Sequence, residues 1–266
     1  MDLIREKLLK RNFKILFWVQ AFMNVKLVNM ISTLFYVKRG LNLTEVFLLV
    51  IVWAIVNLIF EVPSSYMADK FGRKKTLMIG IVFAMLSSIL NILAYSFPMF
   101  ILATASYAFC FACFTGTDDA LIYDTNKELK KDDSSLKELG KYYSAQRIFK
   151  IFSPLIAAFL ANELLDWQFN LINLLDLLSV IIAFGLTIFL IEPKHKEDVF
   201  EEQTAVFKEA VKLFLSDKIF FKAMLSRTLI FISGFILWRI YQDYYFNLGL
   251  TLLAIGLLTS SYQLII

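Results

Sequence analysis

The stretch that decides the fold reads Ser65-Tyr66-Met67-Ala68-Asp69-Lys70-Phe71-Gly72-Arg73-Lys74-Lys75-Thr76-Leu77, and it separates two long apolar runs. Gly72 permits the positive φ of a tight turn, and the basic residues that follow it suit the anionic leaflet of a membrane. A basic loop explains the lysines. It does not explain the acid Asp69, which stands before a glycine at the end of an apolar helix. The stretch therefore predicts a specific kind of tight cytoplasmic turn.

The composition of the whole chain is that of a membrane protein. Hydrophobic residues make up 59% of the 266 residues, and the mean hydropathy is +0.66. A soluble domain is roughly 45–50% apolar, so lipid must be part of the solvent of this chain. The net charge of +4 is mild and no basic stripe carries interleaved aromatics, which excludes nucleic-acid binding. Cys110 and Cys113 lie in an apolar run as packing residues, and neither a metal site nor a cofactor is expected.

Apolar runs long enough to cross a bilayer, which takes about 20 helical residues, recur along the chain. They cover 15–37, 43–66, 76–96, 98–122, 142–163, 168–191, 219–246 and 250–266. The expected fold class is an all-α polytopic membrane protein, with a six-helix N-terminal bundle and two further transmembrane helices. Its expected parts are the bundle (1–191), a cytoplasmic linker (192–218) and the start of an incomplete C-terminal bundle (219–266).

The distribution of lysine and arginine predicts the orientation. Residues 1–14 and the connectors after spans two, four and six are rich in basic residues, whereas the opposite connectors hold only Lys38 and Arg39. By the positive-inside rule the N-terminus and the larger connectors are cytoplasmic. The first run has no small-residue cleavage site and is expected to remain as a span. Lysine-rich, glycine-poor usage indicates a bacterial plasma membrane.

The linker at 192–218 carries its own pattern. Phe200, Phe207, Val211 and Phe214 recur at helical spacing and form one apolar stripe beside basic residues. This predicts an amphipathic helix on the membrane surface, with an ordinary solvated linker as the alternative.

The opening stretch resembles the signature loop of the major facilitator superfamily, G-x-L-a-D-r-x-G-r-k-x-x-l, which joins helices 2 and 3. The matching residues are Ala68, Asp69, Lys70 (for Arg), Gly72, Arg73, Lys74 and Leu77. Ser65 replaces the first glycine and Met67 the leucine. Glu61-Val62-Pro63 and the stretch from Gly116 to Asp124 are similar to bacterial drug-efflux members. The resemblance implies two six-helix halves, so the chain is expected to be truncated after its eighth helix.

The resemblance also implies a conformational charge network at the cytoplasmic face. Carried over, its members are Asp69, Gly72, Arg73, Lys74 and Asp124. Such a network latches the cytoplasmic side closed in the outward-facing state. The alternative is a static interfacial salt bridge.

Arg147 begins span five on the same face, and we expect it to join the network as a further member.

Ionisable residues inside the spans are candidates for a solute and proton cavity, because each costs at least about 2.5–3.5 kcal/mol at mid-bilayer. They are Lys26 in span one, Asp118 and Asp119 in span four, and Lys150 in span five, spans that line the cavity in the resembled family. A buried carboxylate near a cation can exchange a proton as access switches. Adjacent helical residues point about 100° apart, so one of the two acids faces the cavity, and Asp119 is favoured. Lys26 as a paired structural charge is the alternative.

Span seven adds Arg239 and Asp243, which stand at i, i+4 and are expected to pair. They contact substrate or belong to an interfacial aromatic belt. Asp176 in span six has no role in this scheme.

These features predict a secondary active transporter that moves a small solute by alternating access, coupled to protons, with efflux favoured over uptake. Exporters of the family often carry a G-P-x-x-G-type stretch in helix 5, and its absence from 142–163 counts against export by antiport. No enzyme motif of the H-E-x-x-H, G-x-x-x-x-G-K-[ST] or G-x-S-x-G type is present, so no enzyme is expected. The alternative is a non-transporting truncated fragment or assembly element. The expected partners are a small molecule, protons and the lipid bilayer, and the oligomeric state stays open.

Overall fold

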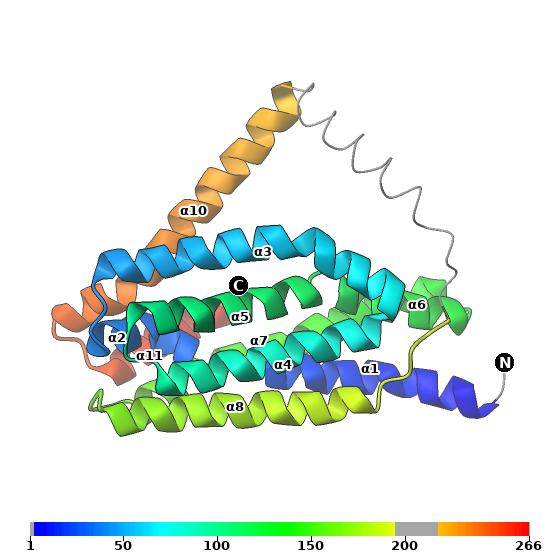
Figure 1. The fold of residues 1–266 in the computed structure, drawn as a ribbon, viewed down its shortest axis with the longest axis horizontal. Coiled ribbons are helices and arrows are strands. Elements are labelled where there is room, and N and C mark those ends of the chain that lie inside the picture. Colours follow the sequence, from blue (N-terminus) through cyan, green and yellow to red (C-terminus); the bar gives the residue numbers. More distant parts are fainter. Residues whose placement is uncertain (1–2, 195–217, 266) are drawn as a thin grey trace.

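The computed structural model describes residues 3–194 and 218–265, and in these ranges every regular element is a helix (Figure 1). The elements are α1 (Leu3–Met23), the 3-10 helix η1 (Val28–Ile31), α2 (Ser32–Lys38), α3 (Leu43–Phe71), α4 (Arg73–Leu93), α5 (Phe97–Phe114), α6 (Thr117–Glu128), the 3-10 helix η2 (Asp132–Ser134), α7 (Ser135–Leu160), α8 (Asp166–Ile188), α10 (Lys218–Asn247) and α11 (Leu252–Ile265). The predicted all-α fold class is confirmed.

Length and composition identify five described segments that can cross a membrane. They are Leu3–Lys38, Leu43–Phe71, Arg73–Leu93, Phe97–Glu128 and Asp166–Ile188. The helix α7 is not among them, because Gln146, Arg147 and Lys150 interrupt its apolar run. These three residues lie on a helix that packs within the bundle, against α1 and α11.

Two predicted spans are interrupted, which the apolar pattern does not reveal. In the first, residues 24–27 separate α1 from η1, and Lys26 has a positive φ of 30°. In the fourth, Gly116 adopts the left-handed conformation at φ 76° and separates α5 from α6. Gly116 can do so without a Cβ clash, whereas Lys26 holds a conformation that is uncommon for a residue with a side chain.

The helices pack around two apolar clusters. One contains Phe35, Phe100 and Phe169, in which the ring of Phe35 contacts the rings of both others. The other contains Leu77 and Ile81, which are fully buried where α1, α4 and α8 meet.

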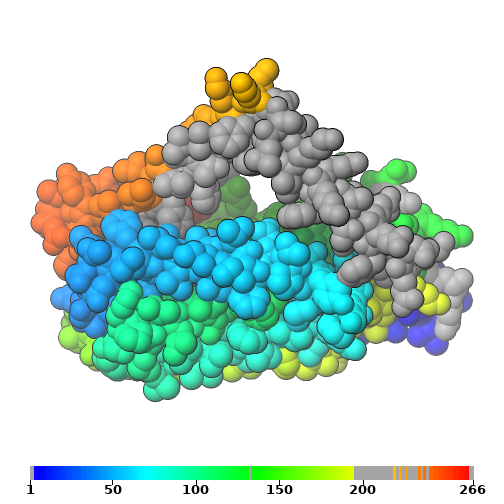
Figure 2. Space-filling model, turned by 45° about the horizontal axis from the view of Figure 1, so that its top comes forward, coloured from blue at the N-terminus to red at the C-terminus, as the bar shows by residue number. Residues whose placement is uncertain are grey.

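By contrast, α3 forms much of one outer face of the molecule (Figure 2). Its Leu58 is 72% exposed and its Ile59 is 58% exposed. A helix with so much apolar surface uncovered is suited to face lipid.

One end of the bundle, here called the basic end, comprises residues 3–14, 69–75, 124–131 and 188–194. Contacts between these segments hold it together. The guanidinium of Arg5 donates to Glu128 through Nε at 2.5 Å and through Nη2 at 3.0 Å. Glu128 also accepts the backbone N–H of Lys194 at 2.8 Å, and the buried Asn12 exchanges two hydrogen bonds with the backbone of Ile191. The basic segments that the sequence places on one side therefore meet at one end of the structure.

The helices α10 and α11 join the bundle at the opposite end and along α7 (Figure 1). The side-chain oxygen of the buried Gln242 accepts the N–H of Thr33 at 3.3 Å. At Gly256 the helix α11 approaches α7 so closely that an added Cβ would lie 2.8 Å from the Cβ of Ala158 and 2.9 Å from the carbonyl oxygen of Pro154. A glycine is needed at this crossing.

The predicted membrane-surface helix of the linker, with Phe200, Phe207, Val211 and Phe214, lies outside the described residues.

Candidate solute cavity and charge network

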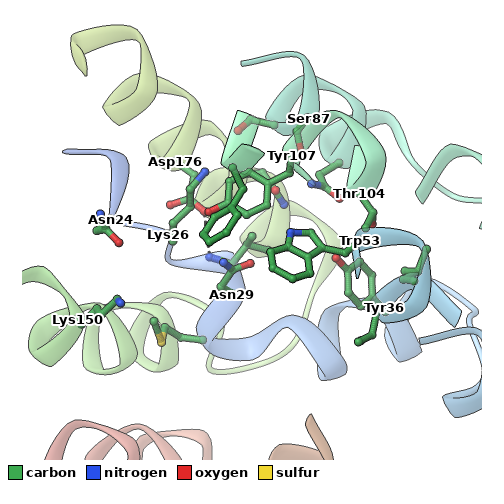
Figure 3. Close-up of a pocket in the computed structure, with 18 of the residues that line it drawn as sticks. Asn24, Lys26, Asn29, Tyr36, Trp53, Ser87, Thr104, Tyr107, Lys150 and Asp176 are labelled. Carbon is green, nitrogen blue, oxygen red and sulfur yellow. Dashed lines mark hydrogen bonds between the residues drawn. The ribbon is translucent and has the colours of Figure 1, made fainter. Parts of the chain in front are cut away.

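A cavity of about 540 Å³ lies inside the bundle, a volume suited to a small solute (Figure 3). Its walls come from the break after α1, from η1 and α2, and from α3, α4, α5, α7, α8 and α11. Polar lining residues are Asn24, Lys26, Asn29, Ser87, Ser88, Asn91, Thr104, Gln146, Lys150, Asn173, Asp176 and Gln263, and aromatic ones are Tyr36, Trp53, Tyr107 and Phe111. A bundle with an apolar exterior thus holds a cavity whose walls combine polar and charged side chains with apolar and aromatic ones.

The break in the first span forms part of the cavity wall. Asp176 of α8 binds the backbone of this broken segment. One carboxylate oxygen of Asp176 accepts the N–H of Leu27 at 2.7 Å, and the other accepts the N–H of Val28 at 3.0 Å. The hydroxyl of Ser153 donates to the carbonyl of Val25 at 2.6 Å. Buried backbone groups that a helix break releases need such partners. Sequence reasoning left Asp176 without a role because its partners are backbone groups, which have no residue signature.

Two lysines predicted to line a cavity, Lys26 and Lys150, do line it. The ammonium of Lys26 lies 4.3 Å from the centroid of the Tyr107 ring, within cation–π range. Neither lysine makes a salt bridge to a residue that the structure describes. Asp176 is the one carboxylate among the described lining residues. The cavity therefore holds more positive than negative side chains.

The two acids of span four, by contrast, lie outside this cavity. The turn at Gly116 places Asp118 and Asp119 in the first turn of α6, toward α7. There Tyr142 donates to Asp118 at 2.6 Å, and Tyr143 donates to both oxygens of Asp119 at 2.7 and 2.9 Å. The expectation that Asp119 faces the cavity is corrected, because the helix break redirects this turn. Asp118 is the more buried of the two.

The pair predicted in span seven is described only in part. Asp243 accepts a hydrogen bond from Asn247 at 3.1 Å and is not a lining residue of the cavity. The side chain of Arg239 lies outside the described residues.

At the basic end the structure brings together three predicted members of the charge network. The Nε of Arg73 lies 2.6 Å from an oxygen of Asp124, and its Nη2 lies 3.8 Å from Asp69. Arg73 and Asp124 are 13% and 10% exposed, so this ion pair is largely withdrawn from solvent. Arg147, expected beside them, is exposed on α7 and makes no salt bridge to a described residue.

A residue that sequence reasoning missed, Glu192, binds the turn itself. Its two oxygens accept the N–H groups of Arg73 at 2.7 Å and of Lys74 at 2.9 Å, which are unpaired donors in the first turn of α4. The side chain of Lys74 donates to the carbonyl of Ile188 at 2.6 Å. Gly72 has a φ of 99°, and a Cβ on it would lie 3.0 Å from Cδ of Glu192. The glycine thus serves both the turn and the approach of the carboxylate.

The opposite end, here called the far end, is organised by Arg39. Its Nη1 donates to backbone carbonyls at the end of α4, namely those of Asn91 (3.2 Å), Ile92 (3.1 Å) and Ala94 (2.9 Å). Its Nη2 donates to Asn170 at 2.6 Å, and its Nε lies 3.4 Å from Asp166, both on α8. The guanidinium also stacks on Tyr95 at 4.2 Å, and the side chain is 0% exposed. Arg39 thereby joins α2, α4 and α8.

Comparison with known proteins accounts for this architecture. The family model for the Major Facilitator Superfamily matches residues 16–266. The chain belongs to the major facilitator superfamily. It is therefore a multi-pass membrane protein of a transporter superfamily, and the signature-loop resemblance is confirmed at the level of the family.

Solved structures of this superfamily share the fold. A bacterial homologue of the human lysosomal transporter Spinster, in an inward-facing and unoccupied conformation, has a TM-score of 0.76 at 14% identity over 99% of this chain and 60% of that chain. A peptide transporter POT in complex with sulfate has a TM-score of 0.58 at 13% identity over 85% of this chain and 52% of that one. A POT family transporter in complex with 5-aminolevulinic acid has a TM-score of 0.58 at 13% identity, with coverages of 85% and 50%.

The chain thus spans between 50% and 60% of the length of these structures, and identities this low show the fold alone. A comparison with curated protein sequences finds no match.

Proposed function

We propose that the chain moves a small solute across the membrane by alternating access, with the polar cavity as its binding site. The observation that carries this proposal is a cavity with charged walls inside an apolar bundle. Each charge placed at mid-membrane has a cost and asks for a purpose. In transporters, binding sites near the bilayer midplane are often formed where a spanning helix is broken, as the first span is here.

The Arg73–Asp124 pair at the basic end is proposed as the latch of this cycle. It joins the start of α4 to α6, and Glu192 ties the same turn to the end of α8. An ion pair at the rim of the bundle can break when water reaches it, so access from this end can open without loss of the helices. A static salt bridge is the competing role for the same residues.

Proton coupling is proposed to involve Asp118. This buried acid is paired with the phenol of Tyr142, and no salt bridge to a described residue fixes its charge. An acid held by a neutral partner can gain or lose a proton without breaking an ion pair. The less buried Asp119, bound by Tyr143, is the second candidate.

Three points stay predictions. They are that the solute moves outward, that the chain is related to drug-efflux members, and that the basic end is cytoplasmic in a bacterial plasma membrane. The alternative, a non-transporting fragment, predicts that the cavity is reached from one face of the membrane only. Labelling from each face can therefore distinguish it from transport.

The test is labelling of the cavity from each face of the membrane. Asn29→Cys places a thiol on the cavity wall, in a background where Cys110 and Cys113 are replaced by serine. The membrane-impermeant reagent MTSES is added to right-side-out and to inside-out vesicles. Alternating access predicts labelling in both preparations, because the cavity opens in turn to each side.

Two matched thiols give the orientation. Ser96→Cys is exposed at the far end and Lys131→Cys is exposed at the basic end, and each is expected to react in one preparation only. A thiol at residue 29 that reacts from a single face would support the non-transporting alternative and count against transport.

A further inference from the structure

We propose that the cavity selects an anionic solute, and that its two lysines, Lys26 and Lys150, attract the negative group, a carboxylate or a group of similar charge. This inference rests on the proposed function in one respect, namely that the same cavity is the binding site. It adds the chemical class of the solute.

The first argument is the balance of charge in the cavity. Lys26 and Lys150 each bring an ammonium group, and Asp176 brings the one carboxylate of the described lining. Both oxygens of that carboxylate already accept backbone N–H groups. Asp176 thus stabilises the broken helix. It interacts electrostatically with Lys26, but no salt bridge within 4.0 Å is described between it and either lysine. An ammonium in a site of low dielectric favours an anion beside it far more strongly than it would in water.

The second argument is the hydrogen-bonding capacity that the lysines leave unused. An ammonium has three N–H donors. The contact described for Lys26 is with the face of the Tyr107 ring, which satisfies charge but gives no oxygen acceptor. Lys150, which comes from α7, has no described hydrogen bond. A carboxylate oxygen of a solute can accept a hydrogen bond from such an ammonium.

The third argument is the position of Lys26. Its backbone lies in the break between α1 and η1, and the flanking residues are held by Asp176 and Ser153. Figure 3 shows Lys26 beside Asp176 and Tyr107, with Lys150 on a separate helix. Because the contacts with Asp176 and Ser153 hold the backbone around Lys26 in place, binding of a solute at Lys26 requires less ordering of the site.

The rest of the lining describes the remainder of the solute. Side-chain amides surround the cavity, contributed by Asn24, Asn29, Asn91, Gln146, Asn173 and Gln263. They suit a solute that carries several hydrogen-bonding groups. Trp53 and Phe111 contact each other at 5.2 Å between ring centroids and supply an apolar patch on one side. The walls thus fit a small polar acid better than a cationic, lipophilic drug.

The test compares two thiol reagents of opposite charge, which act as the small probes. The chain with Asn29→Cys, in the cysteine-free background, is reacted with anionic MTSES and with cationic MTSET, and the ratio of the two rates is measured. Both reagents react with the same thiol, so differences in the accessibility and ionisation of that thiol cancel in the ratio. The same ratio at Ser96→Cys, which is exposed outside the cavity, is the reference.

A positive cavity predicts a MTSES/MTSET ratio about tenfold higher at residue 29 than at residue 96, because a nearby positive charge favours the anionic reagent and disfavours the cationic one, and screening limits the effect. Lys26→Gln and Lys150→Gln are each expected to lower the ratio severalfold. Lys141→Gln, an exposed neighbour on α7 paired with Glu138, is the matched control and should leave it unchanged. Thr104→Cys on α5 provides a second reporter if the first variant does not fold.

A ratio at residue 29 equal to or below the reference, or a ratio that the lysine substitutions leave unchanged, would overturn the inference. That result would leave labelling from both faces, and therefore the proposed transport, untouched. Labelling from a single face combined with a high ratio would remove transport and retain the anion site.

Discussion

The two ends of the bundle are each organised by one arginine, and the two arginines bind different kinds of partner. Arg39 at the far end is 0% exposed and donates mainly to neutral groups, three backbone carbonyls and an amide, with Asp166 at 3.4 Å as its one described carboxylate partner. Arg73 at the basic end is 13% exposed and binds two carboxylates. Backbone carbonyls cannot change their charge or swing away, whereas an ion pair can be opened by water. The comparison supports the proposal of a fixed clamp at the far end and a latch at the basic end.

The largest effect is expected when the clamp is removed. Arg39→Ala leaves the carbonyls at the end of α4 without their donors and should lower the free energy of unfolding by about 3–5 kcal/mol, as for other broken buried charge networks. Chemical unfolding in detergent micelles measures this. Lys38→Ala, its exposed neighbour, is the control and should change stability little. Equal stability of the two variants would remove the distinction between the ends.

A smaller but clear effect is expected at the turn of the basic end. Gly72→Ala forces a side chain into a φ of 99° and toward Glu192, which should cost about 1–3 kcal/mol. Gly140→Ala in α7 is a matched control. Nothing lies within 4 Å of the Cβ position there, and alanine has a higher helix propensity than glycine. Thermal unfolding of the pair measures the difference. If Gly72→Ala were as stable as Gly140→Ala, the approach of Glu192 would have no energetic importance.

How much the sequence could predict differs between the ends as well. Apolar length predicted the helices closely, as for α3, expected at 43–66 and observed at Leu43–Phe71. The motif predicted that Asp69, Arg73 and Asp124 would meet, because each has a charged side chain at a recognisable position. Glu192 could not be found in this way, since it binds backbone N–H groups.

The interior of the bundle shows the same limit. Lys26 was expected in the cavity because a charge in an apolar run is conspicuous, but the break around it was not, since no glycine or proline marks it. Gly116 did offer a signal for the second break. Without that break Asp119 was wrongly expected to face the cavity.

The latch is expected to affect access more than stability. Asp124→Asn removes the charge that Arg73 binds at 2.6 Å and should shift the balance of labelling at Asn29→Cys between the two faces by roughly tenfold, equivalent to about 1.4 kcal/mol. Glu138→Gln, which breaks the exposed pair with Lys141, is the control. An unchanged balance would assign the Arg73–Asp124 pair a static role.

The smallest effect on stability, under about 1 kcal/mol, is expected for the isosteric change Asp118→Asn, because the amide oxygen can still accept from Tyr142. Its effect should appear in the pH dependence of the ratio of labelling at residue 29 from the two faces, a ratio in which the titration of the thiol itself cancels. The change is expected to abolish that dependence. Asp119→Asn, whose acid is bound by Tyr143, is the comparison and should retain that dependence. The reverse outcome would move the coupling site to Asp119.

Solute movement itself tests the central claim most directly. Proteoliposomes that contain the chain, and matched liposomes without it, are given a mixture of small carboxylates, amides and amines under an imposed pH gradient, and mass spectrometry follows the content of each solute. The account predicts that the content of a carboxylate changes faster where the chain is present than in the matched liposomes, and that Lys26→Gln abolishes this difference. Equal contents in both kinds of vesicle for every solute would contradict it.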